Sequence, residues 1–147
     1  MPLLLRLLLD TNILIHLIRQ SALGQWSESQ YALTGSAQVP LISSVTEGEL
    51  RSFAIYANWG REKQRALQDI LNRFVIVPIE LPGIMQGYAE IDATSTKEGR
   101  SMGKNDVWIA ATARVTGAKL LTTDKDFDHL SPALITRDWI DPDRTFE

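Results

Sequence analysis

Four carboxylic acids lie beside short apolar segments that are far apart in the sequence. Asp10 directly follows such a segment, Asp124 follows another after two threonines, Asp106 precedes one, and Glu49 comes a few residues after another. If the apolar segments are neighbouring elements of one fold, these four side chains can meet although no two are close in the chain. The acids are therefore the first candidates for chemistry.

Carboxylates gathered in one place repel one another, and their pKa values rise unless a cation lies between them. Oxygen ligands favour Mg²⁺ or Mn²⁺ over zinc. The chain offers no rival ligand set, because it has no cysteine and its two histidines, His16 and His129, are far apart in sequence. A metal held by carboxylates, with open positions for a phosphate, is typical of phosphoryl transfer or phosphodiester hydrolysis. The acids thus predict a Mg²⁺ or Mn²⁺ site for phosphate chemistry.

The elements that must position these acids follow from the apolar pattern. Nearly continuous apolar runs are typical of strands buried on both faces, and they occur at 3–9, 39–42, 75–79 and 119–121. Apolar residues at helical spacing occur over 12–18, 46–57, 61–74, 81–98 and 105–115. This alternation predicts a three-layer α/β/α fold with a central parallel sheet. Ligands of such sheets bind at the carboxyl ends of the strands, where the four acids are expected to converge.

Each acid also has a purely structural interpretation. Asp10 and Asp106 can cap a helix N-terminus or complement its dipole, an interaction worth about 0.3 to 1 kcal/mol. Asp124 fits a turn, and Glu49 fits the solvated side of a helix. Capping alone, however, does not require every cap to be acidic or all of them to lie at one edge, so the four together favour a site.

Length and composition are those of one globular domain spanning residues 1–147. Fifteen Lys and Arg against eighteen Asp and Glu give a net charge of −3, which excludes a polybasic nucleic-acid binder. A polyanionic substrate would therefore need a metal cation or a local basic patch at the point of contact. The absence of cysteine suits a cytoplasmic location. Arg6 interrupts the first apolar run, so neither a signal peptide nor a membrane span is expected.

In its motifs the chain resembles the PIN-domain ribonucleases, and more narrowly the VapC-type toxins of toxin–antitoxin pairs. The resemblance lies in four segments that occur in the family's order and span most of the chain: Leu8–Ile15, Ile42–Leu50, Asn105–Ala113 and Leu120–Phe127.

The resemblance implies a metal-dependent endoribonuclease in which water is the nucleophile and the products carry a 5′-phosphate and a 3′-hydroxyl. Four acids would form its catalytic site: Asp10, Glu49, Asp106 and Asp124. Within this set the resemblance gives Asp10, Asp106 and Asp124 as metal ligands, with Glu49 binding a second ion or orienting water. Supporting roles fall on Thr11, Asn12, Thr122 and Asp126, the last at the rim of the site.

Glu47 competes with Glu49 for the second acidic position. Residues two apart on a helix point in nearly opposite directions, so only one of them can face the site. A buried stripe containing Val45, Leu50, Phe53 and Ala57 would place Glu49 nearer its centre, and Glu47 has Arg51 four residues later as a surface partner. The family pattern, with its acid immediately before a leucine, also favours Glu49.

The resemblance further implies RNA as substrate, a cognate antitoxin protein, a homodimer and no membrane association. Two sets of side chains remain open between interaction and structural roles. The basic set could either guide RNA along one flank of the site or simply form a solvated helix face. It consists of Arg51, Arg61, Lys63 and Arg65. The aromatic set could either form a protein interface or pack within the core and at its edge. It consists of Trp26, Tyr31, Tyr56 and Trp59.

Several other protein classes also place acids at strand ends or share the PIN fold, and each is an alternative to a VapC-type toxin. A haloacid-dehalogenase-like phosphatase needs a second aspartate where Asn12 stands, and a response-regulator receiver domain does not explain Asp124. A PIN nuclease with a housekeeping role in RNA processing, or a non-catalytic PIN module for RNA binding or assembly, is the remaining alternative. Loss of one or more of the acids would mark the non-catalytic module, but all four are present.

Overall fold

The fold was analysed in a computed structural model that describes residues 6–35 and 37–146. Five strands form one parallel sheet in the order β3-β2-β1-β4-β5. Their bounds are β1 Leu7–Leu9, β2 Leu41–Ser43, β3 Val75–Val77, β4 Lys119–Thr122 and β5 Thr136–Trp139. The helices are α1 Thr11–Arg19, α2 Ala22–Gln30, α3 Ser44–Tyr56, α4 Arg61–Arg73, α5 Ile84–Lys97, α6 Lys104–Thr116 and a 3₁₀ helix η1 Lys125–Leu130.

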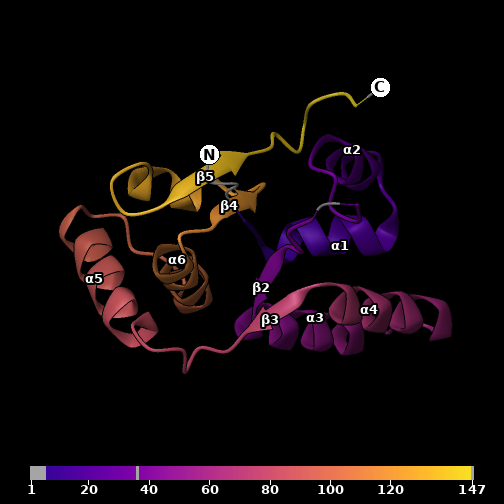
Figure 1. The fold of residues 1–147 in the computed structure, drawn as a ribbon, viewed down its shortest axis with the longest axis horizontal. Coiled ribbons are helices and arrows are strands. Elements are labelled where there is room, and N and C mark those ends of the chain that lie inside the picture. The colour runs from indigo at the N-terminus through magenta and orange to yellow at the C-terminus, as the bar shows by residue number, and fades with distance from the viewer. Residues whose placement is uncertain (1–5, 36, 147) are drawn as a thin grey trace.

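Helices cover both faces of the sheet, so the predicted three-layer α/β/α arrangement is confirmed (Figure 1). Alternate residues of each strand point to opposite faces. Leu9 and Leu121 pack into the core formed with α1 to α4, while Leu8 and Leu120 pack into the core formed with α5, α6 and η1. The central strand β1 is apolar at all three positions because both of its faces are covered, and its neighbours β2 and β4 are apolar over Leu41–Ile42 and Leu120–Leu121.

The apolar runs located the strands but not all of their ends. Residues 3–5 of the first predicted strand lie outside the described residues, and β1 begins at Leu7. The strand predicted at 39–42 begins at Leu41, after Pro40 and the exposed Val39, and that predicted at 75–79 ends before Pro78. Proline lacks the N–H that a ladder needs, which accounts for both boundaries.

Two elements escaped sequence analysis, α2 and β5. The α2 segment is largely polar, with only Leu23, Gly24 and Ser27 buried, so it lacks a strong apolar stripe. The edge strand β5 has no fully buried residue and therefore no apolar run. Asp124, which fits a turn in the sequence, is the N-cap of η1, a 3₁₀ helix that the apolar pattern did not predict. In the described part of the chain, no helix combines the length and the apolar composition needed to span a bilayer.

A close backbone contact fixes the angle between α1 and α2. A Cβ added to Gly24, in the first turn of α2, would lie 2.3 Å from the carbonyl oxygen of His16 near the end of α1. The same oxygen accepts a hydrogen bond from the Ser21 N–H at 3.2 Å, and the Ser21 hydroxyl caps α2 at the Gly24 N–H. Only glycine fits at this crossing without displacing a backbone.

We expect Gly24→Ala to lower the free energy of unfolding by about 1 to 3 kcal/mol, because the added methyl group overpacks a backbone contact. The matched control is Gly48→Ala, also within a helix, where an added Cβ meets no atom within 4 Å. It should raise the free energy of unfolding by about 0.5 to 1 kcal/mol. Urea titrations of the two variants measure both changes, and equal effects would contradict the close contact.

Candidate active site

Asp10 lies where β1 ends and α1 begins, at the centre of the carboxyl edge of the sheet. Its backbone N–H continues the ladder to β4 by donating to the Leu121 carbonyl at 3.0 Å. Its side chain is only 3% exposed and caps α1 by accepting from the Thr11 N–H at 2.8 Å. The capping role considered from the sequence is therefore real, and one carboxylate oxygen is occupied by it.

The other carboxylate oxygen of Asp10 also receives hydrogen bonds. The Thr122 hydroxyl donates to Oδ2 at 2.7 Å from β4, and the Asn12 amide donates at 3.2 Å. Burial raises the pKa of Asp10 to about 6, while the hydrogen bonds from Thr122 and Thr11 oppose the rise. The negative charges of Glu49 and Asp124 raise it further.

Asp106 lies in the first turn of α6, a position favourable for an anion. Among the described residues, no side chain or backbone N–H donates a hydrogen bond to its carboxylate. Burial, followed by the charges of Asp10, Asp124, Glu49 and Asp126, raises its pKa to about 7. Four other acids thus act on one half-buried carboxylate, so the structure brings the four predicted acids together.

Asp124 follows β4 and caps η1 by accepting from the Asp126 N–H at 2.9 Å. One carboxylate oxygen each from Asp106, Asp124 and Asp126 lie within 4.8 Å of one another. Asp10, predicted as a metal ligand, is not in this group of three, and its oxygens accept from Thr11, Asn12 and Thr122. Asp126, predicted only to support the site at its rim, takes the third position, and burial together with the charge of Asp124 raises its pKa.

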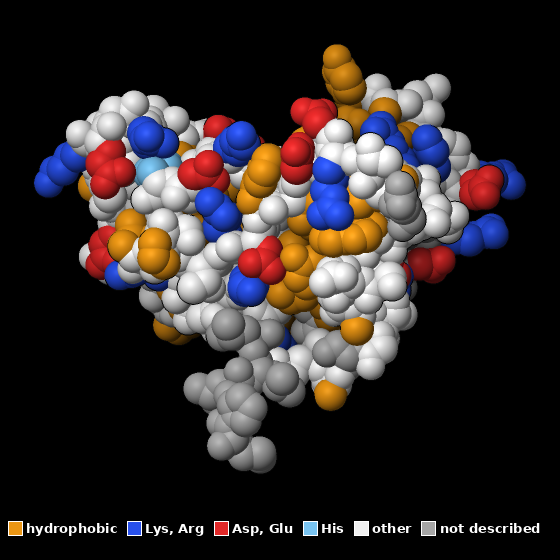
Figure 2. Space-filling model, turned by 90° about the horizontal axis from the view of Figure 1, so that it is seen from above, with side chains coloured by type: hydrophobic (Ala, Val, Ile, Leu, Met, Phe, Trp, Pro, Cys, Tyr) orange, Lys and Arg blue, Asp and Glu red, His pale blue; other side chains and the backbone are white. Residues whose placement is uncertain are grey.

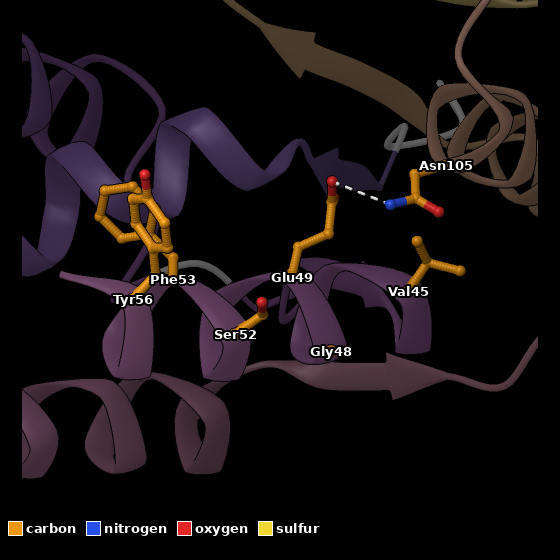
Figure 3. A pocket seen from close by; sticks show the side chains of 7 residues that line it. All are labelled: Val45, Gly48, Glu49, Ser52, Phe53, Tyr56 and Asn105. Atoms are coloured by element: carbon orange, nitrogen blue, oxygen red, sulfur yellow. Dashed lines mark hydrogen bonds between the residues drawn. The ribbon is translucent and has the colours of Figure 1, made fainter. Parts of the chain in front are cut away.

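The structure distinguishes clearly between Glu49 and Glu47. Glu49 accepts from the Thr11 hydroxyl at 2.6 Å. It also accepts from the Asn105 amide at 3.3 Å, the contact drawn in Figure 3. Glu47 instead pairs with Arg51 at 2.8 Å. Ala57, placed in the buried stripe from the sequence, is exposed just beyond the end of α3, yet Glu49 still faces the other acids.

The predicted supporting residues connect the elements that carry the acids. The Asn12 side-chain oxygen accepts from the Thr123 N–H at 3.3 Å, and the Thr122 hydroxyl accepts from the Asp124 N–H at 2.9 Å. Thr11 joins α1 to α3 through Glu49. These side chains tie β1, β4 and α3 together at the edge of the sheet.

Two residues that take part in the hydrogen bonds of the site, Thr46 and Asn105, were not singled out from the sequence. The hydroxyl of the buried Thr46 lies 3.1 Å from that of Thr11, and Asn105 donates to Glu49. The only sequence signal for Asn105 was its place immediately before Asp106. Thr46 carried no signal, because a threonine in the first turns of a helix is ordinary.

The histidines and the basic residues considered from the sequence lie outside the group of acids. His16 and His129 each hydrogen bond to a serine hydroxyl, Ser21 and Ser95 respectively, both at 2.8 Å. On the face that Figure 2 shows, Lys and Arg side chains alternate with Asp and Glu and form no broad basic patch. Of the basic set, Arg51 pairs with Glu47, and the other three are exposed on α4.

The four aromatic residues left open from the sequence have different surroundings. Trp59 is buried, and Trp26 packs edge-to-face on Tyr31 with ring centroids 6.1 Å apart. Tyr56, in contrast, is exposed at the end of α3. Three of the four therefore have packing roles.

Comparisons with known proteins agree with this geometry. The family model for the PIN domain matches residues 7–131. The Haemophilus influenzae protein Ribonuclease VapC2 is 30% identical over 137 residues, covering 92% of this chain and 99% of its own length. The structure of VapBC-1 from nontypeable Haemophilus influenzae aligns with a TM-score of 0.76 and 25% identity, over 90% of this chain and 96% of that one. VapBC2 from Rickettsia felis, bound to a DNA fragment from its promoter, aligns with a TM-score of 0.77 and 24% identity, over 91% and 98% of the two chains.

The raised pKa values predict how the stability of metal-free protein depends on pH. Folded Asp10 and Asp106 bind protons up to about pH 6 and 7, whereas an ordinary aspartate loses its proton near 3.8. Between about pH 4 and pH 7 the folded state therefore binds more protons than the unfolded state. As a result, these two groups lower the free energy of unfolding as pH rises through this range. We expect Asp106→Asn to be more stable than the unmodified protein at pH 7, and this difference to vanish towards pH 4.

Thermal unfolding in the presence of a chelator, followed between pH 4 and 8, measures this difference. Asp69→Asn, which removes an exposed acid of α4, is the matched control and should not produce the pH-dependent gain. Parallel pH profiles for Asp106→Asn and the unmodified protein would contradict the clustering of charge around Asp106.

Proposed function

The chain belongs to the PIN domain family, as its motifs predicted, and we propose that it is a metal-dependent endoribonuclease that acts as the toxin of a toxin–antitoxin pair. The observation that carries the proposal is the environment of Asp106, a half-buried carboxylate acted on by four other acids. Such a cluster is unfavourable without a cation and suited to phosphate chemistry with one. The relative named Ribonuclease VapC2 supports RNA as the substrate.

The donor set fits a hard divalent ion. Asp106, Asp124 and Asp126 offer carboxylate oxygens within 4.8 Å of one another, and oxygen-only ligation favours Mg²⁺ or Mn²⁺. We propose these three as the residues that hold the ion, with Asp10 at the buried side of the site as the fourth acid. An ion bound there would supply positive charge that polarises water and offsets the charge of the scissile phosphate.

The remaining roles follow from the hydrogen bonds. Asp10 is held by Thr11, Asn12 and Thr122, so it presents a fixed negative charge to the site. Glu49 has a carboxylate steadied by Thr11 and Asn105, and we propose that it orients the attacking water by accepting its hydrogen bond.

The proposal includes two protein partners. Solved structures of VapBC complexes resemble this chain over nearly its whole length, which supports an antitoxin as the cognate partner. The second proposed partner is another copy of this chain, with which it would form a homodimer, as expected for VapC-type proteins. We further propose a cytoplasmic location and one nuclease domain over residues 1–147.

We expect Asp106→Asn to slow cleavage of single-stranded RNA by at least about 100-fold, and chelation by EDTA to abolish it, with activity restored by Mg²⁺ or Mn²⁺. Cleavage of a labelled oligonucleotide, with mapping of the 5′-phosphate and 3′-hydroxyl ends, measures both effects. Glu47→Gln is the matched control, because Glu47 lies two residues from Glu49 but pairs with Arg51 away from the acids; it should cleave at the unmodified rate. Activity that survives EDTA would overturn the proposal.

Expression of the unmodified chain in a bacterial host should arrest growth, and co-expression of the adjacent gene's product should relieve the arrest. Asp106→Asn should not arrest growth, because the arrest requires cleavage. Colony counts with and without induction measure the effect. RNA cleavage in vitro without growth arrest would support a housekeeping nuclease instead of a toxin.

A further inference from the structure

A groove of about 570 Å³ runs along one side of α3, beside the acids. Figure 3 shows the side chains that line it: Val45, Gly48, Glu49, Ser52, Phe53, Tyr56 and Asn105. All but Asn105 come from α3, at the three- and four-residue spacing that places side chains on one helical face. The groove therefore extends from the acidic site along the helix towards its C-terminal end.

The far end of the groove is aromatic. Phe53 is half-buried and packs edge-to-face on the buried Trp59, with ring centroids 5.5 Å apart. Tyr56, one turn further on, is 90% exposed. A large aromatic ring so exposed adds little to folding, whereas it offers a flat face on which another ring can stack.

The near end of the groove is part of the acidic site. Glu49 lines the groove and also interacts with Thr11 and the charge of Asp106. Asn105 donates to Glu49 through its amide nitrogen, while its carbonyl oxygen points away from Glu49 (Figure 3). A ligand in the groove is thus continuous with whatever binds at the acids.

A positive charge lies beside the aromatic end of the groove, whereas Glu49 lines the other end. The guanidinium of Arg19, at the end of α1, lies 5.5 Å from the centroid of the Phe53 ring. An arginine held over an aromatic ring keeps its N–H groups available at its edges, where a phosphate binds well.

We propose that this groove binds an unpaired nucleobase of the RNA, next to the nucleotide whose phosphate is cleaved, with the base stacked on Tyr56 above Phe53. The inference rests on the proposed function and goes beyond it by assigning the base to residues outside the acidic site. Ser52, one turn before Tyr56, also lines the groove and is placed to hydrogen bond with the base. From Glu49 to Tyr56 the helix advances about 10 Å, so the stacked base belongs to a neighbouring nucleotide.

The same geometry selects single-stranded RNA. A base inside a duplex is already stacked and paired, and only an unpaired base can turn its face to a protein ring. Tyr56 is therefore a positioning and selectivity residue and takes no part in bond cleavage.

The test compares Tyr56→Ala with Tyr56→Phe, which keeps the ring and loses only the hydroxyl. Loss of one base–aromatic stack weakens binding by about 5- to 100-fold. We expect Tyr56→Ala to raise KM for a single-stranded oligonucleotide by that factor with kcat nearly unchanged, and Tyr56→Phe to retain the original KM. Ile55→Ala is the matched control, because Ile55 is the adjacent residue, is 79% exposed and does not line the groove.

A second measurement does not depend on cleavage. In an Asp106→Asn background, fluorescence anisotropy should show the same 5- to 100-fold weaker binding of the labelled oligonucleotide when Tyr56→Ala is added. The preference for single-stranded over duplex RNA of the same sequence should shrink with it. Circular dichroism of each variant verifies that this exposed substitution leaves the fold intact.

The outcomes separate the two proposals. If the unmodified protein does not cleave RNA, the proposed function fails and the inference fails with it. If it cleaves RNA and Tyr56→Ala has an unchanged KM and binding constant, only the inference is overturned. If Tyr56→Ala leaves RNA kinetics unchanged but abolishes rescue by the adjacent gene's product, the groove is a protein-docking surface and the nucleobase assignment is wrong.

Discussion

Gathering carboxylates at one edge of a sheet is electrostatically unfavourable, and most of the polar interactions around the site serve to hold that arrangement. Asp106 has no hydrogen-bond donor among the described residues, and burial and its acidic neighbours raise its pKa to about 7. Asp10 is more deeply buried but accepts from Thr11, Asn12 and Thr122, and its pKa rises less, to about 6. The hydrogen-bond donors therefore offset part of the cost of burying the Asp10 anion, whereas the Asp106 anion receives no such compensation from the described residues.

The parallel sheet prevents the acids from separating. The strand β1 is flanked by β2 and β4, so Asp10 cannot shift without breaking ladder hydrogen bonds on both sides. Thr122 then links β4 to β1 through Asp10, and Thr11 links α1 to α3 through Glu49. The site is thus fixed by backbone pairing and by short side-chain bonds between elements, which is the rigidity that a preorganised metal site requires.

Much of the fold could be predicted from the sequence because its central strands are buried on both faces and therefore leave continuous apolar runs. The meeting of the four acids followed from the rule that parallel strands end at one edge. What the pattern could not supply was the direction of individual side chains. The hydrogen bonds that occupy both Asp10 oxygens and the place of Asp126 in the carboxylate group depend on rotamers and on a 3₁₀ turn, and neither leaves a periodic signal. The helix α2 and the strand β5 were missed because polar elements at the periphery have no apolar stripe to detect.

The helix α3 joins the acidic site to the groove proposed to bind a base. Its buried residues, Thr46, Leu50 and Ala54, pack into the protein, while Glu49 and Tyr56 lie along the adjacent groove-lining face. The net charge of −3 means that contacts to phosphates can supply only limited affinity for RNA. Stacking of a base on an aromatic ring does not require positive charge on the protein, because it uses the face of the base. An acidic nuclease can therefore gain affinity from the base and reserve its charged groups for the cation and the scissile phosphate.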